Sequence, residues 1–267
     1  GVLSGGFASV PRDVGFEGLV GGGECRRPVV VNAGGGEVLK GPGGLISGGA
    51  PKGGVGGSIN IIPERGVDEP LTGVTPFFSS QGQCGTAVDI GRRFGDAKEW
   101  GVRANGVYQN GATAIDKERL ELGFGSLGVD YRGDRFRASF DVSYQDSYYD
   151  RNRGYLFVFP GVAIPKAPKL SRNLDQRGQY QGDRSFLGAT RFEYDITDDT
   201  TVYAAFGAGT FHEEALSNFK FLFSPNGSFA NFFVRQAFDN EAFSAETGVR
   251  TKFDTGPIRH TVSLAAT

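Results

Sequence analysis

The chain contains no methionine, and only two of its 267 residues are cysteines and two are histidines. Cys25 and Cys84 are too few to build a disulfide framework or a structural zinc site. They could pair with each other or remain free thiols, and the sequence leaves both possibilities open. His212 and His260 are far apart in the sequence and offer little for histidine-based metal chemistry. We therefore expect no metal site built from cysteine and histidine.

Long apolar runs and a strong excess of charge are also missing. No segment approaches the roughly 18 consecutive apolar residues that indicate a transmembrane helix, so spanning helices are excluded. A barrel strand remains possible, because it needs only about ten alternating residues. The formal net charge is −2 and the basic residues are scattered. This distribution argues against a nucleic acid as partner.

Nucleotide-binding and catalytic motifs fail in their sequence context. In the glycine-rich stretch, Gly48–Gly53 is followed by Gly54 and Val55 instead of the Lys and Ser/Thr of a phosphate-binding loop. Gly123–Gly128 matches G-x-G-x-x-G, but the residues after it alternate as strand, turn and strand. A dinucleotide-binding loop must lead into a helix. Because no nucleophile is paired with a base either, we predict that the protein is not an enzyme.

From about residue 73 onward, apolar and polar residues alternate with a period of two. In Phe136–Gln145, aromatic and aliphatic residues occupy one face, and Arg, Ser, Asp and Gln occupy the other. Phe243–Phe253 repeats the pattern, and in Leu120–Tyr131 the alternation is predicted to change phase near Ser126. A period of two predicts strands. We expect strands of roughly 9 to 13 residues, long enough to cross a bilayer at a tilt.

Short and long connections alternate along the chain. Short polar turns are predicted at 95–98, 132–135, 197–200 and 254–257. Longer connections are predicted at about 81–85, 110–117, 149–183 and 212–242. In an up-and-down sheet, this order places all short turns at one end and all long loops at the other, as in outer-membrane barrels. The sequence therefore predicts an all-β fold, an antiparallel transmembrane β-barrel or part of one. Lipid would be the partner of its outer surface.

The stretch EVLKGPGGLISGGAPKGGVGGSINIIPER (Glu37–Arg65) resembles the end of the plug domain in TonB-dependent siderophore receptors. GFASVPRDVGFEGLVG (Gly6–Gly21) is similar to the plug segment before it, and Val88–Gly111 is similar to the first barrel hairpin. Two departures occur: Gly34–Gly36 stands where the family has Glu-Arg-Val, and Ser47 stands where it has a ligand-facing tyrosine. The glycines of such a segment allow its backbone to run close to other backbone inside a barrel.

The resemblance implies a fragment of a larger receptor. Residues 1–70 would be the C-terminal part of the plug domain, and residues 71–267 the N-terminal part of the outer-membrane β-barrel. The partial barrel would hold about nine strands of a larger barrel, forming a curved sheet around the partial plug. The family's TonB box would lie outside this chain. The location implied is the outer membrane of a bacterial cell.

Candidate ligand contacts follow from the same resemblance. Arg12, Arg26 and Arg27 could present positive charge to an anionic ferric chelate, or they could be solvated loop residues. Ser47 occupies the position of the ligand-facing tyrosine. Phe221 and Phe232 belong to a phenylalanine-rich hairpin, FKFLF–SPNGS–FANFF, that extends an external loop. These rings could hold an apolar ligand, face lipid or pack the loop. Glu37, Lys40 and Arg65 are predicted to form ion pairs between plug and barrel.

The function implied is the import of a ferric siderophore, powered by the inner-membrane TonB–ExbB–ExbD complex. Iron would arrive already chelated, so it would be part of the ligand and no cofactor is expected. A receptor for another bulky nutrient, such as a cobalamin or a glycan, is the nearest alternative, because ligand choice depends on apex and loop residues. A non-transporting β-sheet fragment is the alternative of a different class.

Overall fold

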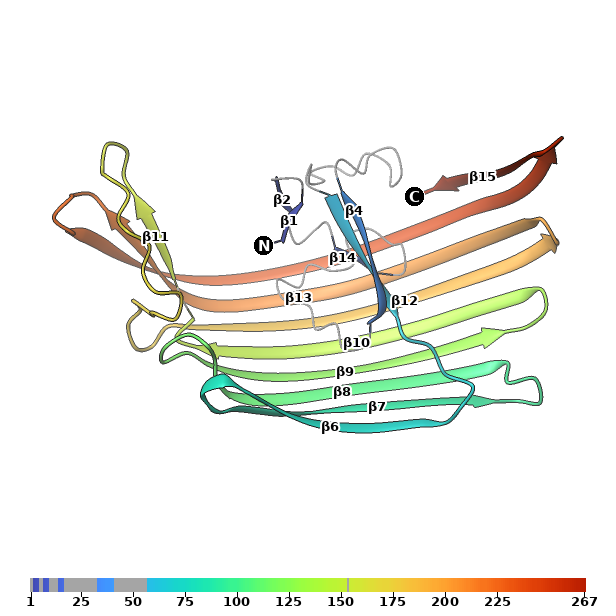
Figure 1. Ribbon diagram of the computed structural model, residues 1–267, viewed down its shortest axis with the longest axis horizontal. Helices are drawn as coiled ribbons and strands as arrows, with labels where there is room; N and C mark the ends of the chain where they lie inside the picture. The colour runs from blue at the N-terminus through green and yellow to red at the C-terminus, as the bar shows by residue number, and fades with distance from the viewer. Residues whose placement is uncertain (1, 5–6, 10–13, 17–32, 41–56, 153) are drawn as a thin grey trace.

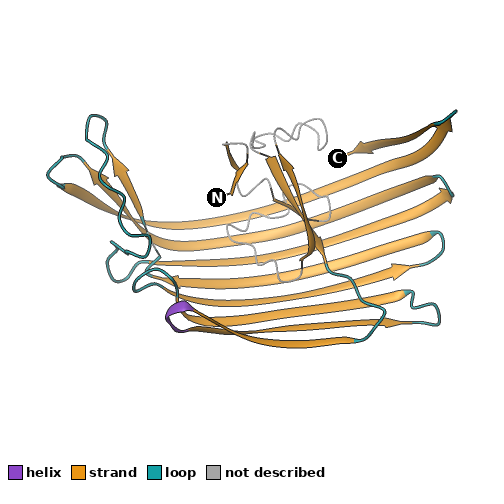
Figure 2. Cartoon of the chain, viewed as in Figure 1, coloured by secondary structure: helices purple, strands orange, loops and turns teal. Residues whose placement is uncertain are grey.

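A computed structural model describes residues 2–4, 7–9, 14–16, 33–40, 57–152 and 154–267. Strands account for nearly all the regular structure of this part of the chain, and the one helix is a single turn at Ser80–Gly82 (Figure 2). Within the described residues, no helix is both long and apolar enough to cross a membrane. The all-β class predicted from the alternating sequence is confirmed.

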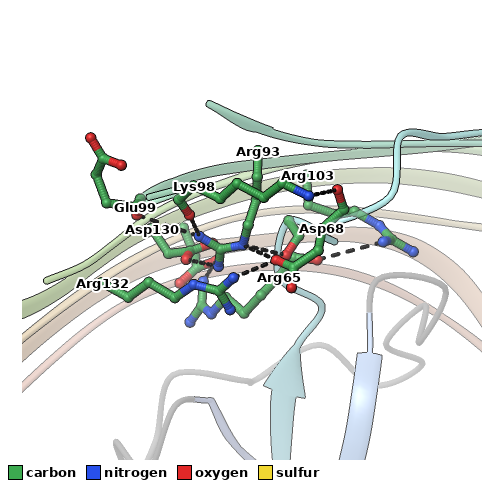
Figure 3. A network of polar contacts seen from close by, with 10 residues as sticks. Arg65, Asp68, Arg93, Lys98, Glu99, Arg103, Asp130 and Arg132 are labelled. Carbon is green, nitrogen blue, oxygen red and sulfur yellow. Dashed lines mark hydrogen bonds and ion pairs between the residues drawn. The ribbon is translucent and has the colours of Figure 1, made fainter. Parts of the chain in front are cut away.

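One large sheet contains most of the strands, and each pairs antiparallel with its neighbours in sequence order (Figure 1). The strands are β6 (Leu71–Ser79), β7 (Gln83–Phe94), β8 (Trp100–Ala112), β9 (Arg119–Arg132), β10 (Phe136–Asp150), β12 (Tyr180–Thr197), β13 (Thr200–Leu222), β14 (Phe229–Thr255) and β15 (Ile258–Ala266). A short strand, β11 (Tyr155–Val158), pairs parallel with β13 off this path. The path of nine strands agrees with the expected number, and the sheet curves as an open part of a barrel (Figure 3).

Two small sheets precede the large one. β1 (Val2–Ser4) pairs with β2 (Phe7–Ser9), and β5 (Gly57–Pro63) lies between β3 (Val14–Phe16) and β4 (Ala33–Lys40). β4 and β5 lie on the concave side of the large sheet (Figure 3). Ile61 of β5 packs with Ala189 of β12 and Ala205 of β13. We call the face of the large sheet that carries Ala189 and Ala205 the inner face, and the opposite face the outer face.

The four short turns lie where the sequence predicted them, all at one end of the sheet (right in Figure 2). Longer connections join the strands at the other end, but the predicted connection 212–242 is wrong. β13 has 23 residues and β14 has 27, and they pair through this region up to a turn at 223–228. The predicted strand length of roughly 9 to 13 residues fits β6, β7, β8 and β15. It is too short for β9, β10, β12, β13 and β14. The hairpin of FKFLF and FANFF exists as the far end of this pair.

The predicted phase change in Leu120–Tyr131 is also wrong. β9 pairs with β8 and β10 in unbroken register, so Leu120, Leu122 and Asp130 all lie on the inner face. Along β9, the inner-face side chains change from apolar to charged, while the strand register stays the same. Leu120 and Leu122 pack with Val107 and Tyr149 in a buried apolar cluster, whereas Asp130 is a buried carboxylate.

The two faces of the large sheet differ in chemistry. Large apolar side chains are exposed on the outer face, including those of Phe140, Phe186, Phe206 and Phe243. Near the short turns, a row of rings on this face crosses four strands, with centroid separations of 4.9 Å, 6.0 Å and 6.5 Å; it consists of Trp100, Tyr131, Phe136 and Phe192. The inner face instead carries buried polar side chains, which include Arg103, Asn105, Asp130 and Asp141. The molecule is thus apolar outside and polar inside.

Candidate functional site

The segment after β5 crosses onto the inner face and is held there by arginines. Arg65, which the sequence predicted to form an ion pair with the barrel, contacts Asp141 of β10, with 2.7 Å between Nη1 and Oδ1. Asp141 is almost fully buried, so the guanidinium compensates a carboxylate removed from water. Gly128 leaves room for this pair, because a Cβ there would lie 2.9 Å from Asp141 Oδ1.

Arg103 of β8 provides a second attachment point. Its Nη2 lies 2.7 Å from Glu64 Oε2, and its Nε lies 2.7 Å from Asp89 Oδ1 of β7. The arginine side chain is buried, while both carboxylates are partly exposed. One buried cation therefore links the N-terminal segment to two neighbouring strands of the large sheet.

Arg93 of β7 is the centre of the network (Figure 3). Its side chain is only 3% exposed and forms an ion pair with Asp130 of β9. It also donates to the Gly66 carbonyl over 3.0 Å and to the Lys98 carbonyl in the β7–β8 turn over 3.0 Å. Asp68 lies 3.5 Å from Arg93 and pairs with Arg132 at the rim. These contacts join the segment, two strands and a turn, and we call residues 64–68 with their arginine and carboxylate partners the docking network.

Gly66 can lie directly against the backbones of β7 and β8 because it has no side chain. A Cβ on Gly66 would lie 2.6 Å from the Arg92 carbonyl oxygen, 2.8 Å from Gly101 Cα and 2.8 Å from the Val102 nitrogen. All three atoms belong to the backbones of β7 and β8, so they cannot rotate away as a side chain could. Gly66 directly follows the glycine-rich stretch Glu37–Arg65 and allows a close approach of backbone to backbone. Residues 41–56 of that stretch lie outside the described residues.

A small cavity lies beside the docking network. It is lined by residues such as Glu64, Arg103, Asn105 and Asp141. Its interior has room for about one water molecule, so it is too small for a bulky chelate. The arrangement around it is suited to holding a chain segment against the sheet.

A second candidate site lies at the opposite end of the sheet, where β11, β13 and β14 extend beyond their neighbours. Phe157 stacks on Phe221 with 5.1 Å between ring centroids, and Phe221 meets Phe232 edge to face at 5.6 Å. Phe159 and Phe219 complete the group, at 6.1 Å from Phe221 and Phe157 respectively. The strand register places Phe157, Phe219, Phe221 and Phe232 on the inner face, and Phe159 follows directly after β11. We call these five rings the aromatic surface. Phe232 is 55% exposed, so the surface is open to a ligand.

Only some of the predicted site residues lie in the part of the chain that the structure describes. Arg12, Arg26, Arg27 and Ser47 lie outside the described residues. Glu37 and Lys40 lie in β4, where their backbones pair with Asn60 and Gly57 of β5.

Arg93, Arg103 and Asp130 were not identified from the sequence as members of the docking network. The polar face of an alternating strand was the available signal, but it does not identify ion-pair partners. Cys84 is an exposed free cysteine, and Cys25 lies outside the described residues.

Among the described residues, no group of three or more His, Cys, Asp or Glu side chains could hold a metal ion. The buried carboxylates Asp130 and Asp141 face arginines. Ion pairs of this kind hold a chain segment or a strand in place. The aromatic surface offers contact area and no reactive group.

No family model matches the chain. It is 38% identical over 231 residues to the ferrichrome receptor FcuA of Yersinia enterocolitica, covering 85% of this chain and 30% of the receptor. The crystal structure of BauA, the ferric preacinetobactin receptor from Acinetobacter baumannii, superposes with a TM-score of 0.92 at 33% identity. That match covers 97% of this chain and 39% of BauA.

The closed form of the ferric-catecholate import receptor Fiu from E. coli K12 superposes with a TM-score of 0.80. At 20% identity, with 97% of this chain and 39% of Fiu covered, that likeness shows the fold alone. The chain spans 30% of the length of FcuA and 39% of the length of BauA.

Proposed function

We infer that this chain, which is part of a TonB-dependent siderophore receptor, takes part in importing a ferric siderophore across the bacterial outer membrane. The observation that carries the inference is its likeness to two receptors for iron chelates, at 38% and 33% identity and over most of its length. The polar inner face and apolar outer face are those expected of a barrel sheet with lipid outside and a ligand path inside. Residues 1–70 would be the end of the plug, and residues 71–267 the first part of the barrel.

In this proposal, the ferric siderophore binds at the end of the sheet that has the long connections. The aromatic surface provides contact area, and the apex residues Arg12, Arg26, Arg27 and Ser47 are further candidates. Iron enters as part of the ligand, so no resident cofactor and no covalent chemistry are needed. Energy would come from the TonB–ExbB–ExbD complex acting on the plug. Arg65 and the docking network attach the end of the plug to the large sheet. This attachment would then limit how much of the plug the force displaces.

Ligand binding to the purified receptor tests the function. The protein is expressed with whatever flanking segments its gene encodes, and its affinity is measured for ferric hydroxamate and ferric catecholate chelates, for cobalamin and for oligosaccharides. We expect one class of ferric chelate to bind at least a hundredfold more tightly than the other compounds. Tight binding of cobalamin or a glycan, with no chelate bound, would overturn the proposal.

Replacing Phe232 by alanine tests the aromatic surface. The ring is 55% exposed and meets Phe221 edge to face, so its removal should leave the fold intact. We expect roughly tenfold weaker binding of the chelate, which corresponds to about 1.4 kcal/mol. Phe243→Ala is the matched control, because Phe243 lies on the outer face of the same strand and is 84% exposed. Unchanged affinity in Phe232→Ala, or an equal loss in the control, would contradict the assignment.

A further inference from the structure

The long connection between β10 and β12, residues 151–179, is attached to the far end of β13. Its first part forms β11, which runs parallel to β13 with Tyr155 opposite Phe219 and Phe157 opposite Phe221. β12 begins at Tyr180, opposite Leu216. β11 therefore takes the place beside β13 that β12 leaves vacant. The connection is part of the sheet at this end.

A buried ion pair joins the end of this connection to β13. Asp175 and Lys220 are in contact, and their side chains are only 2% and 6% exposed. The other carboxylate oxygen of Asp175 accepts a hydrogen bond from the Gly154 backbone, just before β11. Asp175 lies near the end of the connection and Gly154 near its start. Through Asp175, both ends are therefore attached to Lys220. Removing one charge would leave the other buried without compensation.

Further polar groups are buried around the pair. With its side-chain amide in the orientation that satisfies its neighbours, Gln179 donates to Asp175 over 3.2 Å and accepts from the Asn218 backbone over 2.8 Å. Asn173 donates to the Arg151 carbonyl over 2.9 Å and accepts from the Asp175 backbone nitrogen over 2.9 Å. Several independent hydrogen bonds therefore hold this part of the connection.

Gly154 allows the close approach that the pair requires. A Cβ at this position would lie 2.4 Å from the Asn218 carbonyl oxygen and 3.0 Å from Asp175 Oδ1. The backbone before β11 is therefore pressed against β13, with room for a glycine alone.

The ion pair and the aromatic surface lie on opposite faces of the same strands. Lys220 stands between Phe219 and Phe221 in β13, and successive side chains of a strand point to opposite faces. Leu156, which is opposite Lys220, likewise stands next to Phe157 in β11. When the ion pair fixes β11 against β13, it also fixes where the Phe157 ring lies relative to the Phe221 ring.

We propose that Asp175 and Lys220 are positioning residues for ligand recognition: their ion pair clamps the connection 151–179 onto β13 and so holds the aromatic surface in shape. The proposal rests on the proposed function for the ligand, but the clamp can be tested without one. It predicts that breaking the pair changes two properties together, the opening of the connection and the affinity for the chelate.

Trypsin cleavage of the folded receptor measures the opening. The bond between Arg151 and Asn152 reports it: Asn152 is buried and the Arg151 carbonyl accepts a hydrogen bond from Asn173, so this bond becomes cleavable when the connection detaches. Lys220→Met and Asp175→Asn should each accelerate cleavage there by roughly tenfold or more, because cleavage follows the population of the locally open state. The double variant Asp175→Asn/Lys220→Met removes both charges and keeps an acceptor for Gly154. It should be cleaved more slowly than either single variant.

Chelate affinity distinguishes positioning from a purely structural role. Each single variant should bind the ferric chelate roughly tenfold more weakly, and the double variant should recover part of the loss. Combining Lys220→Met with Phe232→Ala should give less than the sum of the two separate effects, because both act through the same surface. Arg184→Met, which breaks an exposed outer-face ion pair with Asp146, is the control and should change neither property.

Each result decides one step. Cleavage rates within twofold of the unaltered protein in both single variants would overturn the clamp. Faster cleavage with unchanged affinity, or additive effects with Phe232→Ala, would overturn the positioning role. If the unaltered receptor binds no chelate, the proposed function and the ligand part of this inference both fail. The cleavage rates would still decide the clamp.

Discussion

Replacing Gly66 by valine should lower the free energy of unfolding by about 3 kcal/mol, because overpacking against atoms that cannot move is costly. The new side chain would meet the Arg92 carbonyl, Gly101 Cα and the Val102 nitrogen, all closer than 3 Å. The segment from Glu64 to Asp68 would then have to leave the inner face. Denaturant titration of the refolded receptor measures the loss, and hydrogen exchange of residues 64–70 shows whether the segment detaches.

Gly123→Val is the matched control for this substitution. Gly123 lies in β9, and a Cβ there would have no atom within 4 Å. Valine is also favoured in strands, so the control should change stability by less than about 0.5 kcal/mol. Equal stability of the two variants, with unchanged exchange at 64–70, would show that the close approach of Gly66 to the sheet is not as described.

Replacing Arg93 by methionine should have the second large effect. The substitution removes the buried cation from Asp130 and leaves the Gly66 and Lys98 carbonyls without this donor. Breaking a buried ion pair by removing one partner costs about 3 to 5 kcal/mol. We expect a loss in this range in denaturant titration, together with faster exchange in the β7–β8 turn.

Arg184→Met provides the comparison for Arg93→Met, since Arg184 pairs with Asp146 and is largely exposed. An exposed pair contributes about 0 to 1 kcal/mol. The double variant Arg93→Met/Asp130→Leu should recover much of the stability, because no unpaired charge then remains buried. A loss from Arg93→Met no larger than that from Arg184→Met would refute the central place of Arg93 in the docking network.

The sequence allowed most of the large sheet to be predicted, because a period of two and short polar turns are local signals. Phe136–Gln145 and the turn at 132–135 show both signals, and the structure has β10 and its turn there. The far halves of β13 and β14 carry no clear alternation, since aromatic and polar residues occur on both faces. These halves are strands because they pair with each other along their whole length, which a local pattern does not reveal.

The candidate sites were less predictable, because their contacts join residues that are distant in sequence. Arg65 and Asp141 are separated by 76 positions, and their pairing depends on where β5 meets the sheet. Lys220 lies in a phenylalanine-rich strand, and nothing in its surroundings indicates a partner at Asp175. In Leu120–Tyr131 the apolar residues change from even to odd positions near Ser126, and this pattern suggested a phase change. The structure shows that the inner face also contains an apolar cluster.

Growth rescue tests the central claim most directly. The receptor, with the flanking segments its gene encodes, is expressed in an iron-starved host that lacks its own siderophore receptors, with and without TonB. A panel of ferric siderophores is then supplied as the iron source. The account predicts growth on at least one chelate, only when TonB is present. No growth on any chelate, with the protein present in the outer membrane, would contradict siderophore import.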